Sequence, residues 1–156
     1  MSTVRKAKET DRAGLLALVA AQNNFSDLER EVAGEVIDDG LTGKDDYRIL
    51  VGAAENGAVL GFICYGPIPL TEHSYDLYWV ATLPDHGRQG LGGRLLAAME
   101  EELRSLDAVV YIDTSSTAGY ARARAFYEKH GYRLAARLED FYHPGDDRLI
   151  YRKSLR

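Results

Sequence analysis

A glycine-rich segment is the part of the sequence that points most directly to chemistry. Residues 85–94 read Asp-His-Gly-Arg-Gln-Gly-Leu-Gly-Gly-Arg, between an expected strand and an expected amphipathic helix. Glycines let a backbone approach an anion closely, and the free amides and dipole of a helix start attract negative charge. The segment lacks the Lys-Ser/Thr of a P-loop and the Gly-x-Gly-x-x-Gly of a dinucleotide fold. It predicts another kind of phosphate site, or a turn that only lets helix and strand pack.

A second segment, residues 120–132, reads Tyr-Ala-Arg-Ala-Arg-Ala-Phe-Tyr-Glu-Lys-His-Gly-Tyr. Ala123, Phe126 and Tyr127 are spaced i, i+3 and i+4, so they share one face of a helix. Gly131 is the residue type that commonly ends a helix. Packing in a core is enough to explain this face from its spacing alone.

Both segments resemble signatures of the GNAT superfamily of acyl-CoA-dependent N-acetyltransferases, and the resemblance covers almost the whole chain. The first signature is Gln/Arg-x-x-Gly-x-Gly/Ala, which Gly90 and Gly92 match, with Gly87 in place of the usual Gln or Arg. The second is Asn-x-x-Ala-x-x-x-Tyr-Glu-x-x-Gly-Phe/Tyr. Residues 120–132 match it, with Tyr120 in place of the asparagine.

The resemblance implies that acetyl-CoA is the acyl donor. The amides from Arg88 to Gly93 would cradle its pyrophosphate, and residues 80–82 of a strand would bind its pantetheine arm. Arg94 would either pair with a phosphate or complete a solvated helix face. The residues expected to bind the cofactor are Val80, Ala81, Thr82, Arg88, Gln89, Gly90, Leu91, Gly92, Gly93, Arg94, Tyr120, Ala123 and Phe126.

Two residues are expected to move protons. The resemblance implies that Tyr127 donates a proton to the departing thiolate, with packing as the alternative role. An amine acceptor is mostly protonated at neutral pH and must lose a proton before it attacks. The period of two along a strand places Asp76 on the same face as Tyr78 and Val80. Relatives that use a carboxylate base on this strand place it at the offset of Asp76, which we therefore expect to act as base, directly or through water. Its alternatives are to cap the strand, pair with an arginine or orient a loop.

The acceptor is expected to be the primary amine of a small cationic molecule, acetylated by direct transfer in a ternary complex. The second expected helix and its exit are acidic, and a negative rim attracts cations. Solvated surface is the alternative explanation for most of these charges. A protein or peptide acetyltransferase acting on an amino terminus or lysine is a second hypothesis, and a non-catalytic acyl-CoA-binding regulatory module is a third. The acidic residues are Asp27, Glu29, Glu31, Glu35, Asp38, Asp39, Asp45 and Asp46.

The expected elements form one domain over residues 1–156, of the α/β (α+β) class. Ser26-Asp27-Leu28-Glu29 is a capping box that begins a helix, and Asn56-Gly57 predicts a hairpin turn. We expect a mixed, mostly antiparallel sheet of about seven strands flanked by four helices. The strands are expected near residues 4–8, 49–51, 59–65, 75–82, 109–112, 132–142 and 148–155. Helices are expected from residue 10, residue 26, the glycine-rich segment and residue 119, the third with an apolar stripe of Leu91, Leu95, Met99, Leu103 and Leu106.

Composition limits the remaining classes. The 156 residues carry a formal charge of −5, which argues against a nucleic-acid partner. The single cysteine, Cys64, lies in an apolar run and indicates a core position in a reducing compartment. No apolar stretch approaches the roughly 18 residues of a membrane span, so a cytoplasmic protein is expected. The histidines lack ligand spacing, which predicts no metal site. A homodimer remains open.

Overall fold

Seven strands form one sheet in the computed structural model, which describes residues 2–86 and 89–156. The order is β1-β2-β3-β4-β5-β7-β6, and every pair is antiparallel except β4 with β5. This confirms the predicted mixed sheet. The strands are β1 Ser2–Lys6, β2 Arg48–Ala54, β3 Val59–Pro67, β4 Ser74–Thr82, β5 Val109–Ser115, β6 Arg133–His143 and β7 Asp146–Ser154.

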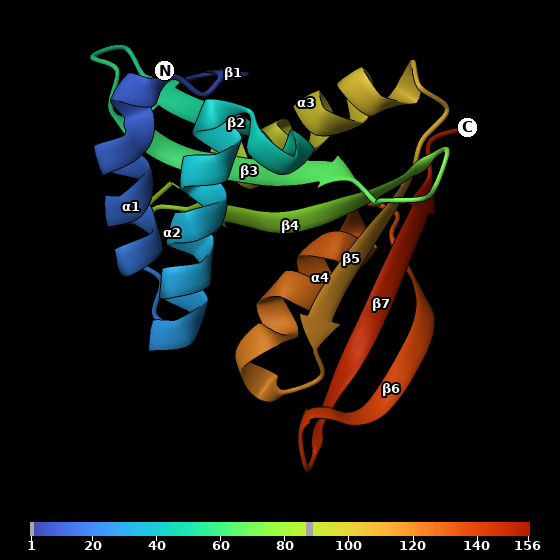
Figure 1. Cartoon of the computed structure of the whole chain (residues 1–156). Helices are drawn as coiled ribbons and strands as arrows, with labels where there is room; N and C mark the ends of the chain where they lie inside the picture. The colour runs from blue at the N-terminus through green and yellow to red at the C-terminus, as the bar shows by residue number, and fades with distance from the viewer. Residues whose placement is uncertain (1, 87–88) are drawn as a thin grey trace.

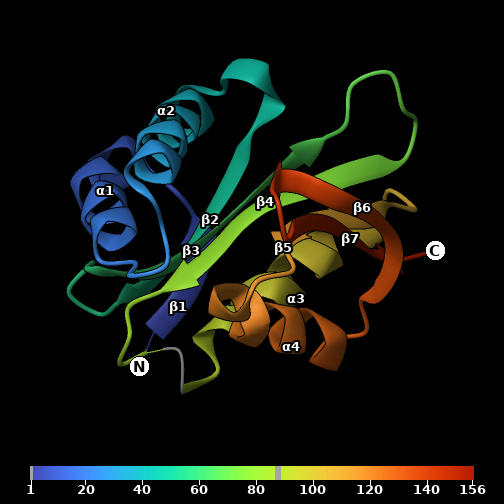
Figure 2. The same cartoon turned by 90° about the horizontal axis from the view of Figure 1, so that it is seen from below.

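Four α-helices cover the two faces of the sheet. They are α1 Arg12–Ala20, α2 Asp27–Thr42, α3 Leu91–Arg104 and α4 Ala121–Lys129, with short 3-10 turns at Glu9–Asp11, Lys44–Asp46 and Ala118–Tyr120. Helices α1 and α2 lie on one side of the sheet, whereas α3 and α4 lie on the other (Figures 1 and 2). Each side has its own hydrophobic core: Leu95, Met99 and Tyr127 belong to the α3–α4 core, and Leu15 and Phe62 belong to the α1–α2 core.

Local sequence signals form the elements they predict. The Ser26 hydroxyl accepts from the Glu29 amide at 3.1 Å, and the Glu29 carboxylate accepts from the Ser26 amide at 3.3 Å, so the capping box begins α2. Gly57 has φ of +87° in the turn between β2 and β3, as the Asn-Gly pair predicted. The expected stripe of α3 is wrong at one position, because the helix ends at Arg104 and Leu106 lies beyond it, 44% exposed.

An extra residue in β4 changes which side chains share a face. Leu77 pairs with Tyr65 and Trp79 pairs with Cys64, so Tyr78 is inserted as a β-bulge. Leu77 and Val80 consequently pack on the same core, the one beneath α3 and α4. Asp76 alternates with Leu77 and therefore lies on the opposite face from Val80. The prediction that Asp76 and Val80 share a face is wrong, because it assumed an unbroken period of two.

Strands β4 and β5 separate soon after they meet. Their parallel pairing covers Ser74–Asp76 on β4 and Val109–Tyr111 on β5, and beyond it the two strands diverge (Figure 1). Since β5 then pairs with β7, the sheet remains continuous but opens between β4 and β5. This opening is where residues from both faces can meet.

Candidate active site

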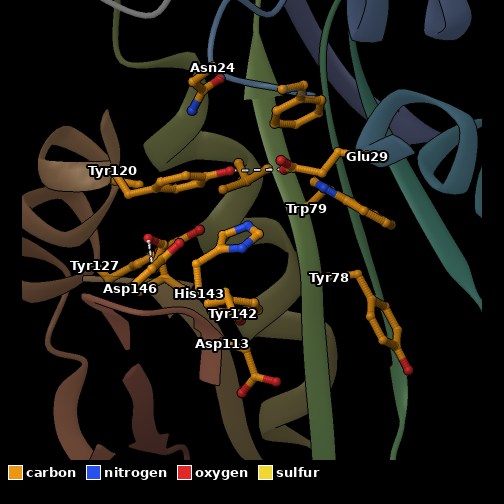
Figure 3. Close-up of a pocket in the computed structure, with 15 residues that line it drawn as sticks. Asn24, Glu29, Tyr78, Trp79, Asp113, Tyr120, Tyr127, Tyr142, His143 and Asp146 are labelled. Atoms are coloured by element: carbon orange, nitrogen blue, oxygen red, sulfur yellow. Dashed lines mark hydrogen bonds between the residues drawn. The ribbon is translucent and has the colours of Figure 1, made fainter. Parts of the chain in front are cut away.

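A cavity of about 360 Å³ fills the opening between β4 and β5 (Figure 3). It is lined from both sides of the sheet: Val80 and Tyr127 pack with the α3–α4 core, whereas Phe25 and Trp79 pack with the α1–α2 core. We call it the passage, because it connects the two faces. Its lining residues are Asn24, Phe25, Glu29, Tyr78, Trp79, Val80, Asp113, Thr114, Ser115, Tyr120, Ala123, Tyr127, Tyr142, His143 and Asp146.

Tyr127 lines the passage from α4. Its side chain is 8% exposed, and its ring lies 6.3 Å from the Tyr132 ring and 6.4 Å from the Tyr151 ring. Burial raises the pKa of Tyr127 to about 12. Among the described residues, no hydrogen bond occupies its hydroxyl. Tyr127 is therefore a protonated phenol whose hydrogen remains available to a bound molecule.

Tyr120 lines the same side of the passage, but its hydroxyl is already used. It donates a hydrogen bond of 2.8 Å to Oε2 of Glu29, and Figure 3 shows the two side chains meeting across the cavity. Burial, followed by the Glu29 carboxylate, raises the pKa of Tyr120. The bond links the α4 side of the sheet to the first turn of α2. A contact of Tyr120 with pantetheine stays a prediction.

Asp76 is absent from the lining of the passage. Burial and the negative charge of Asp113 raise the pKa of Asp76 to about 6, and the positive charge of Arg148 opposes this rise. Asp113 itself lines the passage, and its Oδ2 accepts a 2.6 Å hydrogen bond from Arg148. Asp76 therefore lies close enough to Asp113 to feel its charge but outside the lining, so a bridging water would be needed to reach a bound acceptor. Its role as base stays a prediction.

Several lining residues escaped the sequence reasoning. His143 ends β6, and its ring points into the cavity (Figure 3). Asp113 and Asp146 also lie there, and Asp146 accepts a hydrogen bond from the Ser115 hydroxyl. His143 pairs with Asp146 across the turn between β6 and β7, whereas Asp113 comes from the neighbouring strand β5. No single segment of the sequence indicates that all three face the opening between β4 and β5.

The connection from β5 to α4 is held by Arg124. Its Nη1 donates hydrogen bonds of 2.7 Å to the carbonyls of Ser115 and Thr117. This contact fixes the segment that carries Tyr120. Arg124 thus has a structural role in the connection from β5 to α4.

The glycine-rich segment begins α3. Gly90 has φ of +78° and precedes the first residue of the helix. A Cβ at Gly92 would lie 3.4 Å from Phe126, and one at Gly93 would lie 3.2 Å from His130, so both glycines allow α4 to pack closely. Arg88 lies outside the described residues. Arg94 donates hydrogen bonds of 2.8 Å to both the hydroxyl and the carbonyl of Ser2, a tie to β1 that neither expected role included.

Among the described residues, the side chains that line the passage and carry a permanent charge are acidic. Glu29, Asp113 and Asp146 line it, and no lysine or arginine does so within the described part of the chain. Of the acidic residues expected to form a rim, Glu29 reaches the passage. Asp38 pairs with Arg12 at 2.7 Å on the surface. The acidic rim is therefore narrower than expected.

No three His, Cys, Asp or Glu side chains within residues 2–86 and 89–156 converge as metal ligands would. In the same ranges, none of the helices combines the length and apolar character that crossing a membrane requires. Cys64 is buried and free, as expected for a core residue.

Comparison with known proteins relates this chain to acetyltransferases. The profile of the Acetyltransferase (GNAT) family matches residues 16–132. A protein of Desulfovibrio desulfuricans assigned to the GNAT acetyltransferases is 32% identical, with a TM-score of 0.94 and full coverage of both chains. No curated protein matches the sequence.

More distant solved structures share the fold. The ribosomal-protein-S18-alanine N-acetyltransferase of Escherichia coli is 21% identical with a TM-score of 0.77, over 99% of this chain and 94% of that one. An aminoglycoside 6'-N-acetyltransferase complexed with coenzyme A is 16% identical with a TM-score of 0.76, over 99% and 97%. With the family match, the seven-stranded sheet and the passage between β4 and β5, the chain belongs to the GNAT family of acetyltransferases.

Proposed function

We propose that this enzyme transfers the acetyl group of acetyl-CoA to the primary amine of a small cationic molecule, by direct transfer in a ternary complex. The observation that carries the proposal is the passage through the sheet, lined by three carboxylates and, among the described residues, by no lysine or arginine. Carboxylates in a confined site attract a cation and disfavour an anion. The passage is also rich in aromatic side chains, which suit the carbon skeleton and charge of an amine.

Acetyl-CoA would approach from the α3–α4 face. The family acts with this cofactor, and one solved relative of the fold holds coenzyme A. Beyond Asp76, the side of β4 that faces β5 has no strand partner, which leaves main-chain groups for a pantetheine arm, although the Thr82 carbonyl already accepts a hydrogen bond of 3.2 Å from Gln22. The amides at the start of α3 are available to phosphates for the reason that applies to any helix start. These features support the predicted site at Val80–Thr82 and Gln89–Gly93.

The reaction removes two protons from the acceptor nitrogen and adds one to the sulfur. The acceptor ammonium loses a proton, its nitrogen attacks the thioester carbon, and the nitrogen then loses a second proton to solvent as the tetrahedral intermediate collapses and the C–S bond breaks. Tyr127 would give its proton to the departing thiolate, because its raised pKa keeps it protonated at every physiological pH. Asp76 would accept the ammonium proton through water, as a carboxylate above a pH of about 6.

A peptide amine is the second candidate acceptor. Phe141 and Tyr142 are 52% and 41% exposed at the edge of the passage, where they offer apolar surface to a chain longer than a small amine. The solved relative that acetylates an alanine of a ribosomal protein shares the fold. A non-catalytic acyl-CoA-binding module is the remaining alternative. We also propose a cytoplasmic location, which the free Cys64 favours.

The test is to measure release of coenzyme A from acetyl-CoA with polyamines, amino sugars, peptides and neutral amines as acceptors. We expect turnover with the cationic small molecules. Preferential turnover with peptides would support the second candidate. Tight binding of acetyl-CoA without transfer to any acceptor would favour the regulatory module, and failure to bind coenzyme A would overturn the proposal.

A further inference from the structure

The hydrogen bond between Tyr120 and Glu29 spans the passage. Within the described ranges it is the one hydrogen bond that joins α2 to the segment from Ala118 to Lys129. Because α2 and α4 cover opposite faces of the sheet, the bond crosses the opening where β4 and β5 are unpaired. A molecule that fills the passage must therefore pass beside this bond or replace one of its partners.

Glu29 is held in place by its own helix. Its Oε1 accepts a hydrogen bond from the Ser26 amide at 3.3 Å, which completes the capping box and leaves Oε2 directed at Tyr120. The carboxylate is therefore positioned by the backbone at the start of α2. A group fixed in this way needs no rearrangement to bind a ligand.

Glu29 also lacks a cationic partner. Among the described residues no lysine, arginine or histidine forms an ion pair with it, whereas Asp113 is paired with Arg148 at 2.6 Å. The neutral phenol of Tyr120 is its partner across the passage. A cationic donor adds a Coulombic attraction to the hydrogen bond with the Glu29 carboxylate, which the neutral phenol of Tyr120 cannot supply.

We propose that Glu29 determines acceptor specificity by binding a second positive charge on the acceptor, and that this cation displaces Tyr120. The inference rests on the proposed function. The attacking nitrogen must become neutral before it attacks. A positive charge that remains bound to Glu29 during the reaction therefore belongs to another group of the acceptor. The acceptor class is thereby narrowed from amines in general to molecules with at least two amines, such as diamines, polyamines and sugars that carry more than one amino group.

The experiment compares an α,ω-diamine with the amino alcohol of the same chain length. Both present one primary amine to the thioester, but only the diamine carries a second charge. Glu29→Gln removes the charge while keeping an oxygen for Tyr120 and a residue type that still completes a capping box. Glu31→Gln is the matched control, because Glu31 is exposed on the same helix and does not line the passage.

We expect Glu29→Gln to lower kcat/KM for the diamine about tenfold or more and to change the amino alcohol less than about twofold. Tyr120→Phe removes the competing donor, so it should raise the affinity for the diamine about twofold to tenfold. That gain should vanish when Glu29→Gln is combined with it. The Glu31→Gln variant should keep the parent's preference for the diamine.

Calorimetric binding of both amines to the protein loaded with coenzyme A provides a readout without turnover. Equal affinity of the parent for the two amines would overturn the inference, as would an unchanged preference in Glu29→Gln or an equal loss in Glu31→Gln. If Glu29→Gln does not fold, Tyr120→Phe carries the test: no gain for the diamine in that variant would contradict the displacement. Absence of transfer to every amine would instead count against the proposed function.

Discussion

Asp76 and Val80 lie on opposite faces of β4, although they are four positions apart. Tyr78 is inserted between them as a bulge, so Val80 packs with the α3–α4 core while Asp76 lies on the face that carries Asp113. The two residues therefore lie on different sides of the sheet. In the proposed reaction, Val80 would contact the acyl donor and Asp76 would lie on the side of the acceptor.

Asp76→Asn is expected to remove the acid limb of the pH–rate profile. In the parent, burial and Asp113 raise the pKa of Asp76 to about 6, so kcat/KM should fall as the pH drops through about 6 and the carboxylate becomes protonated. The amide introduced by this substitution accepts no proton, so the variant should be slower by about 10²-fold and show no such limb. Initial rates of the parent and the variant between pH 5 and 9, corrected for the effect of the buffer on the acceptor, would measure this pH–rate profile. An acid limb that survives in the variant would assign the base elsewhere, with His143 as the residue to replace next.

The same substitution should stabilise the protein at neutral pH. A carboxyl whose pKa is raised on folding binds its proton more tightly in the folded state. The free energy of unfolding therefore falls as the pH rises from the carboxyl's ordinary pKa to its raised pKa. Above a pH of about 6, Asp76→Asn should therefore have a free energy of unfolding about 1–2 kcal/mol higher than the parent. The difference should shrink towards pH 4, where the folded carboxyl is protonated and the unfolded one is about half protonated. Urea denaturation at pH 4, 5, 6 and 8 would follow it, and a difference that is independent of pH would contradict the assignment.

Tyr127→Phe should reduce kcat by about 10²-fold and leave the KM for acetyl-CoA close to that of the parent. The phenyl ring keeps the packing against Tyr132 and Tyr151 but cannot donate a proton. Since burial raises the pKa of Tyr127 to about 12, the parent should show no loss of activity from this group up to pH 10.

Tyr151→Phe is the matched control for this substitution, because Tyr151 is a buried neighbour that does not line the passage. We expect near-parental kcat from it. Equal rates for the two variants would show that Tyr127 packs and does not act as an acid.

Gly90→Ala should weaken binding of coenzyme A. Gly90 has φ of +78° at the start of α3, and nothing lies within 4 Å of the Cβ that alanine would add, so the cost is conformational and about 1 kcal/mol. A start of α3 shifted by this strain would misplace its amides. Calorimetry with coenzyme A would detect an affinity lower by about threefold to tenfold.

Gly57→Ala applies the same test to a turn far from α3. Gly57 has φ of +87° and is equally free of neighbours. Its substitution should cost similar stability and leave the affinity for coenzyme A unchanged. If both variants lose affinity equally, the effect reports general destabilisation.

Sequence reasoning predicted what depends on neighbouring residues. The capping box at Ser26, the turn at Gly57 and the glycine-rich start of α3 each follow from chemistry within a few positions, and each appears where expected. The expected mixed, mostly antiparallel sheet of about seven strands flanked by four helices, which resembles the family's fold, is confirmed. The placement of Tyr127 on the passage also agrees with its expected face.

What the sequence could not indicate depends on distant segments. The bulge at Tyr78 depends on the register between β3 and β4, and no residue type in β4 signals it. Glu29 and Tyr120 are 91 positions apart, and their contact follows from the separation of two strands that neither residue belongs to. Arg94 was expected to face solvent or phosphate because nothing in its own helix revealed that Ser2 lies beside it.

The passage through the sheet also suggests how to inhibit the enzyme. Since it opens to both faces, coenzyme A can be joined covalently to a diamine by a linker that threads between β4 and β5. Such a conjugate would fill both sites at once, and the effective concentration of each half for its site would be about millimolar or higher. The linker length of the conjugate that binds most tightly would report the distance between the coenzyme A sulfur and the acceptor's second amine.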